Sequence, residues 1–110
     1  MNKTYCVYII TNINETVLYT GYTQDIQKRM REHKIGEFSN SFSKRYNLKR
    51  LIYFALHLTH QSARHREFLI KKWKREWKEN LIKSKNPAWR DLSDENGEID
   101  EETFTLFLAE

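Results

Sequence analysis

The sequence predicts a small α/β domain of the α+β kind, in which a mainly antiparallel three-stranded sheet is flanked by helices. Residues 5–12 and 17–22 alternate between apolar and polar side chains and are rich in Tyr, Val and Ile, which is typical of strands. Residues 50–58 contain a continuous apolar run, while residues 24–34 and 59–79 repeat apolar side chains at helical spacing. A chain of 110 residues is near the common size for one such domain.

The first two strands form a predicted β-hairpin around the polar residues 13–16. With a loop of four residues, Gly21 lies opposite Tyr8, and Tyr19 lies diagonal to Tyr8 on the same face. A shift of one residue in this register would place the two tyrosines on opposite faces. The register therefore decides whether the tyrosines can act together.

A helix is predicted next, at residues 24–34, with Thr23 as its N-cap and Gly36 just beyond its end. Arg29 and His33 are four residues apart in this segment. Side chains at that spacing project from the same face of a helix, so we expect these two groups to lie close together.

The middle of the chain begins with residues 38–46, which we expect to form a short helix or an ordered loop. The apolar run within residues 50–58 favours a central strand, because a central strand is buried on both faces. One long helix is then predicted from residue 59 to at least residue 79. Its two tryptophans, Trp73 and Trp77, are expected in the core.

Charge divides the chain into a predicted domain, residues 1–92, and an acidic C-terminal tail, residues 93–110. The first part holds all 19 Lys and Arg against 8 Asp and Glu, a net charge of +11, while the second holds 7 acidic residues and no basic ones. Residues 86–92 are expected to be extended after a helix end near Pro87. The tail has a predicted turn at Asn96-Gly97, and residues 103–108 are expected to add a short strand or to remain mobile.

The positive charge of residues 1–92 favours a nucleic acid as partner, because releasing counterions from a phosphate backbone drives such binding. The alternative is that the charge only keeps a small domain in solution. Two interpretations of the acidic tail are equally open. It could lie over the DNA-binding face as a competitor, or it could be a disordered solubilising segment.

Several classes of protein are excluded or disfavoured by composition. The longest apolar stretch is six residues, so a membrane-spanning helix is not expected. No apolar block of the signal-peptide kind stands near the N-terminus. Cys6 is the only cysteine, which rules out an intrachain disulfide and a four-cysteine zinc site. These features predict a cytoplasmic protein.

Hydrolysis of a phosphodiester requires an oriented water, positive charge near the phosphate and usually a divalent metal ion. Tyr8 and Tyr19 are predicted on one sheet face, and Arg29 and His33 on the helix that follows. Glu67, in the long helix, could supply the oxygen ligand that magnesium prefers. The sequence therefore holds side chains for each requirement.

Five blocks of sequence carry a more specific signal, and they follow one another along residues 4–92. They are Cys6-Val7-Tyr8, Tyr19-Thr20-Gly21, residues 23–33, Ala63-Arg64-His65-Arg66-Glu67, and residues 86–92. Together they resemble the GIY-YIG nuclease family, which includes homing endonucleases, some restriction enzymes and the incision module of nucleotide excision repair. The last block resembles that of small, stand-alone bacterial members.

The resemblance implies a GIY-YIG endonuclease-like fold and a metal-dependent DNA endonuclease, structure-selective and related to repair or recombination. Arg29 would stabilise the attacked phosphate, and Glu67 would hold Mg²⁺, with Mn²⁺ as a substitute. Tyr8 or Tyr19 would act on the water, and His33 would accept or orient a proton. A tyrosine base needs a nearby cation to favour its phenolate, a role that Arg29 and the metal ion would fill.

The resemblance also implies a supporting role for Asn86, which would hydrogen-bond a catalytic side chain. DNA is the expected partner, RNA stays open, and another protein could supply specificity. A nuclease with a single site would have to dimerise or act twice to cut both strands. The alternative is a nucleic-acid-binding module of the same fold with weak or no catalysis. Contacts to the nucleic acid are expected from Lys28, Arg31, Lys44, Arg45, Lys71 and Lys74.

Overall fold

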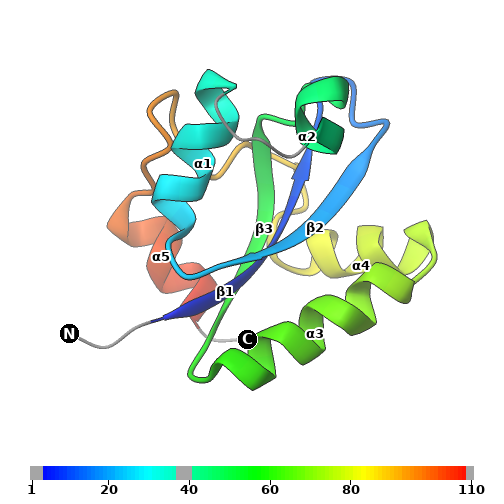
Figure 1. Ribbon diagram of the computed structural model, residues 1–110, viewed down its shortest axis with the longest axis vertical. Helices are drawn as coiled ribbons and strands as arrows, with labels where there is room; N and C mark the ends of the chain where they lie inside the picture. Colours follow the sequence, from blue (N-terminus) through cyan, green and yellow to red (C-terminus); the bar gives the residue numbers. More distant parts are fainter. Residues whose placement is uncertain (1–3, 37–40, 109–110) are drawn as a thin grey trace.

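The computed structural model of the protein describes residues 4–36 and 41–108 (Figure 1). The elements are β1 (Tyr5–Thr11), β2 (Leu18–Thr23), α1 (Ile26–Ile35), α2 (Ser41–Tyr46), β3 (Arg50–His57), α3 (His60–Lys72), α4 (Arg75–Lys85) and α5 (Glu101–Leu108). The strands form one sheet in the order β2-β1-β3, and both strand pairs are antiparallel. The predicted fold class is therefore confirmed. Residues 38–40 of the predicted second helix or loop lie outside the described residues.

The β1–β2 hairpin has the predicted register. Tyr8 is opposite Gly21, and Tyr19 is opposite Ile10, so the two tyrosines lie on the same face of the sheet. The side chain of Asn12 organises the loop, because its Oδ1 accepts hydrogen bonds from the backbone N–H groups of the two loop residues before β2, at 2.9 and 3.1 Å. This local polar network fixes the loop length and, with it, the pairing of the tyrosines.

The prediction that the apolar run of β3 makes it a central strand is wrong, because β1 is the central strand. The free edge of β3 is nevertheless covered. Leu51 donates its backbone N–H to Asp91 Oδ1 at 3.0 Å and accepts one from Leu92 at 2.7 Å. Asn86 Nδ2 donates to the Ile52 carbonyl at 2.9 Å. An edge strand closed in this way can be as apolar as a central one.

Helix α1 begins two residues later than predicted. Thr23 is the last residue of β2, and Asp25 is the N-cap, whose side chain accepts the backbone N–H of Lys28 at 3.1 Å. Thr23 stabilises the turn that precedes the helix, because its Oγ1 accepts a hydrogen bond from the backbone N–H of Asp25. Gly36 ends the helix in the left-handed conformation, as expected for a glycine after the last turn.

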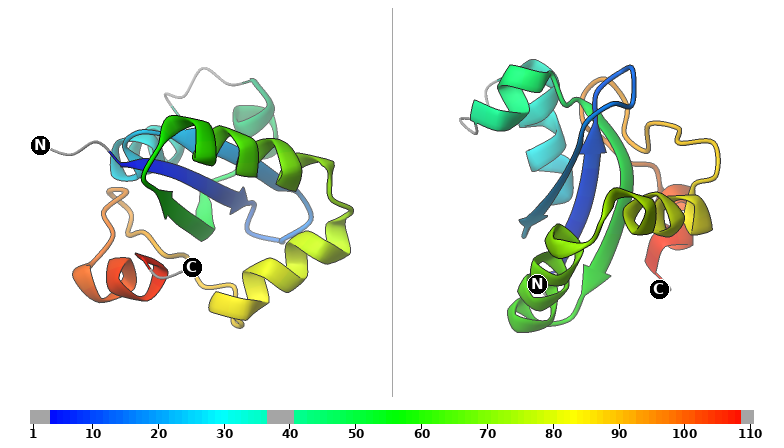
Figure 2. Two further views of the ribbon diagram at one scale, coloured as in Figure 1. Left: turned by 90° about the horizontal axis from the view of Figure 1, so that it is seen from below. Right: turned by 90° about the vertical axis from the view of Figure 1, so that its right-hand side faces the viewer.

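The long helix predicted from residue 59 to residue 79 is two helices. Trp73 leaves helical geometry with φ −69° and ψ 146°, and α4 starts two residues later. Figure 2 shows that the chain turns there, so that α1, α2 and α3 lie on one side of the strands and α4 and α5 on the other. Trp73 packs partly against the core, but Trp77 is 51% exposed, so its predicted burial is wrong.

The C-terminal segment packs against the rest of the protein. Its last part forms α5, so the predicted strand or mobile segment is wrong. Phe107 is 2% exposed, and its ring stacks on Phe54 with centroids 4.8 Å apart. The predicted turn is present at Gly97, whose backbone lies against Arg31 of α1.

These contacts fix the segment: α5 lies across the strands from α2 and α3 (Figure 2), and the turn at Gly97 lies against α1. The interpretation of the segment as a disordered tail is therefore wrong, whereas its competition with DNA stays a prediction. The division of the chain at residue 92 stays a prediction. Within residues 4–36 and 41–108, no helix combines the length and the apolar character needed to cross a lipid bilayer.

Candidate functional site

The two tyrosines meet α1 on one face of the sheet. Tyr8 lies in the centre of β1, and its Oη is 3.5 Å from Nε2 of His33. Arg29, one turn before His33, places its charge beside the Tyr8 phenol and hydrogen-bonds to it, and Tyr19 is close enough to act on the same phenol electrostatically. The four side chains expected to gather from β1, β2 and α1 therefore do so.

Burial decides the protonation of Tyr8. Its side chain is 1% exposed, and this desolvation raises the pKa of the phenol well above the ordinary value of 10.0. Arg29 lowers the pKa, as expected from the sequence, but by less than burial raises it. Tyr8 is therefore a neutral phenol at neutral pH, and Arg29 alone does not make it a phenolate.

Burial also keeps His33 neutral. Its side chain is 3% exposed, and desolvation, assisted by the charge of Arg29, lowers its pKa from 6.5 to about 4. A neutral imidazole has one nitrogen that donates and one that accepts a hydrogen bond. At neutral pH, His33 can therefore exchange a hydrogen bond with Tyr8 without adding a second positive charge beside Arg29.

The pKa of His33 predicts a pH dependence of stability. Between about pH 6.5 and 4 the unfolded chain binds a proton at this position that the folded protein does not, so this contribution to stability is lost as the pH falls. The loss should be of the order of 2 to 3 kcal/mol, reduced by solvent screening. Urea unfolding at pH 7.0 and 4.5 measures it. The same comparison with His33→Gln is the control, since a variant that loses as much stability as the wild type would contradict the assignment.

Gly21 allows the Tyr8 ring to approach β2 closely. A Cβ atom built on Gly21 would stand 2.5 Å from both Cζ and Oη of Tyr8, which is far closer than atoms can approach. The glycine of the second sequence block therefore has a steric purpose. It makes room for the tyrosine of the first block.

We expect Gly21→Ala to displace the Tyr8 phenol and to reduce both stability and any activity that depends on this phenol. Overpacking of this kind typically costs about 1–3 kcal/mol. The free energy of unfolding should be measured for Gly21→Ala, Tyr8→Ala and the double variant. If the Tyr8 ring is the cause, Gly21→Ala should cost almost nothing in the Tyr8→Ala background. An equal cost in both backgrounds would show that the ring is not responsible.

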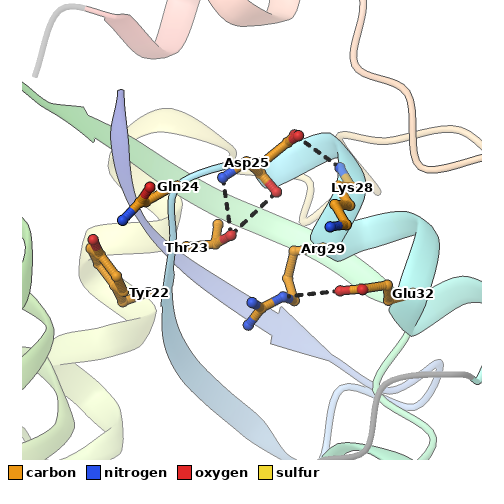
Figure 3. A pocket seen from close by; sticks show the side chains of 7 residues that line it. All are labelled: Tyr22, Thr23, Gln24, Asp25, Lys28, Arg29 and Glu32. Atoms are coloured by element: carbon orange, nitrogen blue, oxygen red, sulfur yellow. Dashed lines mark hydrogen bonds and ion pairs between the residues drawn. The ribbon is translucent and has the colours of Figure 1, made fainter. Parts of the chain in front are cut away.

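A pocket of about 320 Å³ opens beside this cluster, and Arg29 forms part of its wall (Figure 3). Arg29 Nε is 3.2 Å from Glu32 Oε1, an ion pair between residues three apart on α1. The guanidinium is held by this carboxylate near the pocket, where a phosphate group could reach it. The lining residues are Tyr22, Thr23, Gln24, Asp25, Lys28, Arg29 and Glu32.

Glu67 lies on α3 and is joined to the cluster through a lysine. Its side chain is buried, yet both oxygens are paired: Oε1 with Arg64 Nη1 at 3.1 Å and Oε2 with Lys71 Nζ at 2.9 Å. The same Lys71 Nζ lies 5.6 Å from the centroid of the Tyr19 ring. One lysine therefore bridges the carboxylate and a tyrosine of the cluster.

Glu67 offers a divalent metal ion a single carboxylate. Among the residues that the structure describes, no three His, Cys, Asp or Glu side chains gather into a metal site. Mg²⁺, however, keeps several of its waters and often takes only one or two carboxylates together with phosphate oxygens. A single buried carboxylate is compatible with this mode of Mg²⁺ binding, provided that the metal ion displaces Arg64 or Lys71 from the carboxylate.

The role expected for Asn86 is wrong. Within the described residues, its side chain hydrogen-bonds to backbone groups. Nδ2 donates to the carbonyls of Ile52 and Arg90, and Oδ1 accepts a hydrogen bond from the backbone N–H of Arg90. Asn86 therefore holds the loop after α4 against β3. Residues 86–92, the sequence block that contains Asn86, therefore help to close the free edge of β3.

The predicted nucleic-acid contacts have exposed side chains. Five of them belong to α1, α2 and α3, on one side of the sheet (Figure 2), whereas Lys74 lies in the link between α3 and α4, with its Nζ 5.3 Å from the ring centroid of Trp77 in α4. The residues are Lys28, Arg31, Lys44, Arg45, Lys71 and Lys74. Sequence reasoning missed two neighbours of the cluster, Glu32 and Phe42. The spacing of three between Arg29 and Glu32 was a signal for the first, whereas nothing in the sequence pointed to the second.

Comparison with known proteins identifies a family for this chain. The family model described as the GIY-YIG catalytic domain matches residues 4–80. A UPF0213 protein of Haloquadratum walsbyi is 38% identical over 81 residues, covering 74% of this chain and 89% of the relative. A UPF0213 protein of Syntrophus aciditrophicus is 37% identical over 87 residues, covering 79% of this chain and 97% of the relative.

A solved structure is similar as well. The solution NMR structure of a UPF0213 protein from Bacillus halodurans matches with a TM-score of 0.52 and 26% identity, over 80% of this chain and 92% of that one. The family-model match covers well over half of the chain and includes both tyrosines, Arg29 and Glu67. The chain therefore belongs to the GIY-YIG family of nuclease domains.

Proposed function

We propose that the protein is a metal-dependent DNA endonuclease that hydrolyses a phosphodiester bond. One observation carries the proposal: Tyr8, Tyr19 and Arg29 converge from three elements, and Lys71 links Glu67 to the Tyr19 ring. These groups suit the attacked phosphate, the water and a metal ion, the three components that the reaction brings together. GIY-YIG nucleases in general act on DNA and depend on a divalent metal ion.

Each residue has a role that its surroundings suit. Arg29 would pair with the phosphate oxygens and stabilise the charge that develops as the water oxygen bonds to phosphorus and the leaving sugar oxygen departs. Tyr19, the more exposed of the two tyrosines, would orient the water. Tyr8, kept protonated by burial, would donate a hydrogen bond, and His33 would hold its phenol in place.

Glu67 would hold Mg²⁺ or Mn²⁺, and the bound ion would polarise a phosphate oxygen and neutralise part of the developing charge. Before that, the carboxylate must give up at least one of its pairs with Arg64 and Lys71. Both cations lie where phosphate oxygens could take over from the carboxylate. Binding of DNA would therefore help to release Glu67.

The proposal is tested by the conversion of a supercoiled plasmid to its nicked form. The protein should nick the plasmid with Mg²⁺ or Mn²⁺, and nicking should stop when a chelator is added. DNA binding is measured in parallel by a gel-shift assay in the chelator. Binding without nicking under any metal condition would refute the nuclease assignment.

The same pair of assays identifies the second candidate, a nucleic-acid-binding module with weak or no catalysis. Two observations favour it: Glu67 is already neutralised by two cations, and burial keeps Tyr8 from ionising. A binder would shift DNA without cutting it. A role in repair or recombination, a partner protein that supplies specificity, the oligomeric state and a cytoplasmic location stay predictions.

A further inference from the structure

An aromatic row leads away from the proposed catalytic cluster along α2. The row consists of Tyr19, Phe42 and Tyr46. The centroid of the Phe42 ring lies 5.8 Å from that of Tyr19 and 4.8 Å from that of Tyr46. Because Tyr19 belongs to the cluster, the row starts at the site and extends outward from it.

The two outer rings of the row are open to solvent. Phe42 is 41% exposed and Tyr46 is 39% exposed. The helix that carries them is anchored directly after its end, where Leu48 is 1% exposed in the core. Adjacent exposed rings on an anchored element form a contiguous apolar surface, which marks a binding site more often than scattered apolar residues do.

Cations flank the row at both ends. Lys71 Nζ lies 5.6 Å from the Tyr19 ring centroid, and Arg45 Cζ lies 5.4 Å from the Tyr46 ring centroid. The neighbouring Lys44 is exposed as well. Aromatic rings bordered by Lys and Arg are the combination with which proteins bind single-stranded nucleic acids, since bases stack on the rings while phosphates pair with the cations. A duplex keeps its bases stacked inside and can use only the cations.

We propose that the aromatic row binds the unpaired bases of a single strand next to the phosphate that is cut. This inference rests on the proposed function and deepens it by naming the substrate class, DNA with a single-stranded segment at the cleavage site. Phe42 and then Tyr46 would meet bases progressively farther along the strand from the phosphate at Tyr19.

The test compares an unpaired strand with a duplex in binding assays that need no cleavage. Fluorescence anisotropy in the presence of a chelator gives the Kd for oligo-dT of about 15 nucleotides and for a blunt duplex of the same length. Phe42→Ala should weaken oligo-dT binding about tenfold, because one base–aromatic stack is worth about 1–3 kcal/mol. The same variant should change duplex binding by no more than about twofold. Phe42→Trp should retain oligo-dT binding.

Phe68 provides a matched control. It is a 54% exposed phenylalanine on α3 with Lys72 Nζ 4.1 Å from its ring centroid, but it does not belong to the row. Phe68→Ala should therefore leave both affinities unchanged. If Phe42→Ala melts at a lower temperature than the wild type, Phe42→Leu takes its place, because leucine keeps the apolar volume and lacks the aromatic face.

The results separate this inference from the nuclease assignment. Unchanged oligo-dT binding on replacement of Phe42, or equal losses for oligo-dT and duplex, would overturn the stacking role and favour the row as a surface for another protein. Selective loss of oligo-dT binding would support the stacking role whether or not the protein cuts DNA. Failure to nick in every metal, with that selectivity intact, would refute only the nuclease.

Discussion

Arg29→Ala should lower the rate of plasmid nicking by about 10³-fold or more while the protein still folds. An arginine that stabilises charge on a transferred phosphoryl group is worth about 10³–10⁵ in rate. The residue lies beside the Tyr8 phenol and lines the pocket on α1 (Figure 3). Its loss therefore removes positive charge where charge would develop. Single-turnover nicking with saturating enzyme measures the effect without interference from weaker binding.

Two further variants make the result specific to this guanidinium. Arg31→Ala removes an exposed arginine from the same helix and should change the nicking rate by less than about threefold after correction for binding. Arg29→Lys keeps the charge but loses the planar fork, so it should restore only a small part of the rate. Equal effects of Arg29→Ala and Arg31→Ala would mean that both residues serve only to bind DNA.

Glu67→Gln is the second change with a large expected effect, a loss of nicking by about 100-fold or more. A metal ion contributes several kcal/mol of charge stabilisation, and each 1.36 kcal/mol corresponds to a tenfold change in rate. Binding should move in the opposite direction. Arg64 and Lys71 lose their shared carboxylate and become available for phosphates, so DNA affinity in a chelator should stay equal or increase.

Glu79→Gln is the matched control for this prediction. Glu79 is also paired with a basic residue four positions away, with Arg75 Nε 2.8 Å from its Oε2, but it lies on α4. Its replacement should leave nicking unchanged. A Glu67→Gln protein that nicks at the wild-type rate would exclude the carboxylate as the metal ligand and would require another source for the divalent ion.

The hairpin shows that strand pairing can be predicted from the sequence when the interactions that determine it are local. Alternation predicted the two strands, and the length of the loop predicted that Tyr8 faces Gly21. Both follow from the two-residue period of a strand and from turn geometry. The position of Arg29 and His33 on one helix face was predictable for the same reason. Contacts between neighbours in the chain need no knowledge of the remaining fold.

Predictions failed where the structure depends on contacts between elements that lie far apart in the chain. The apolar run of β3 indicated burial correctly, but the cover on its free edge comes from residues about forty positions later, including Asp91. The helix break at Trp73 and the helix at the C-terminus were not predicted, and the latter packs against β3 through the stacked rings of Phe107 and Phe54. Periodicity alone could not reveal either.

By itself, the sequence determined the family, the strand register and the inventory of polar groups for phosphodiester chemistry. Only the tertiary structure decided the state of those groups. Tyr8 and His33 are both neutral because packing removes them from water, and Glu67 meets Tyr19 through Lys71 because α3 crosses the sheet there. Charge and pKa depend on desolvation and distance, and these quantities exist only once remote elements have been packed together.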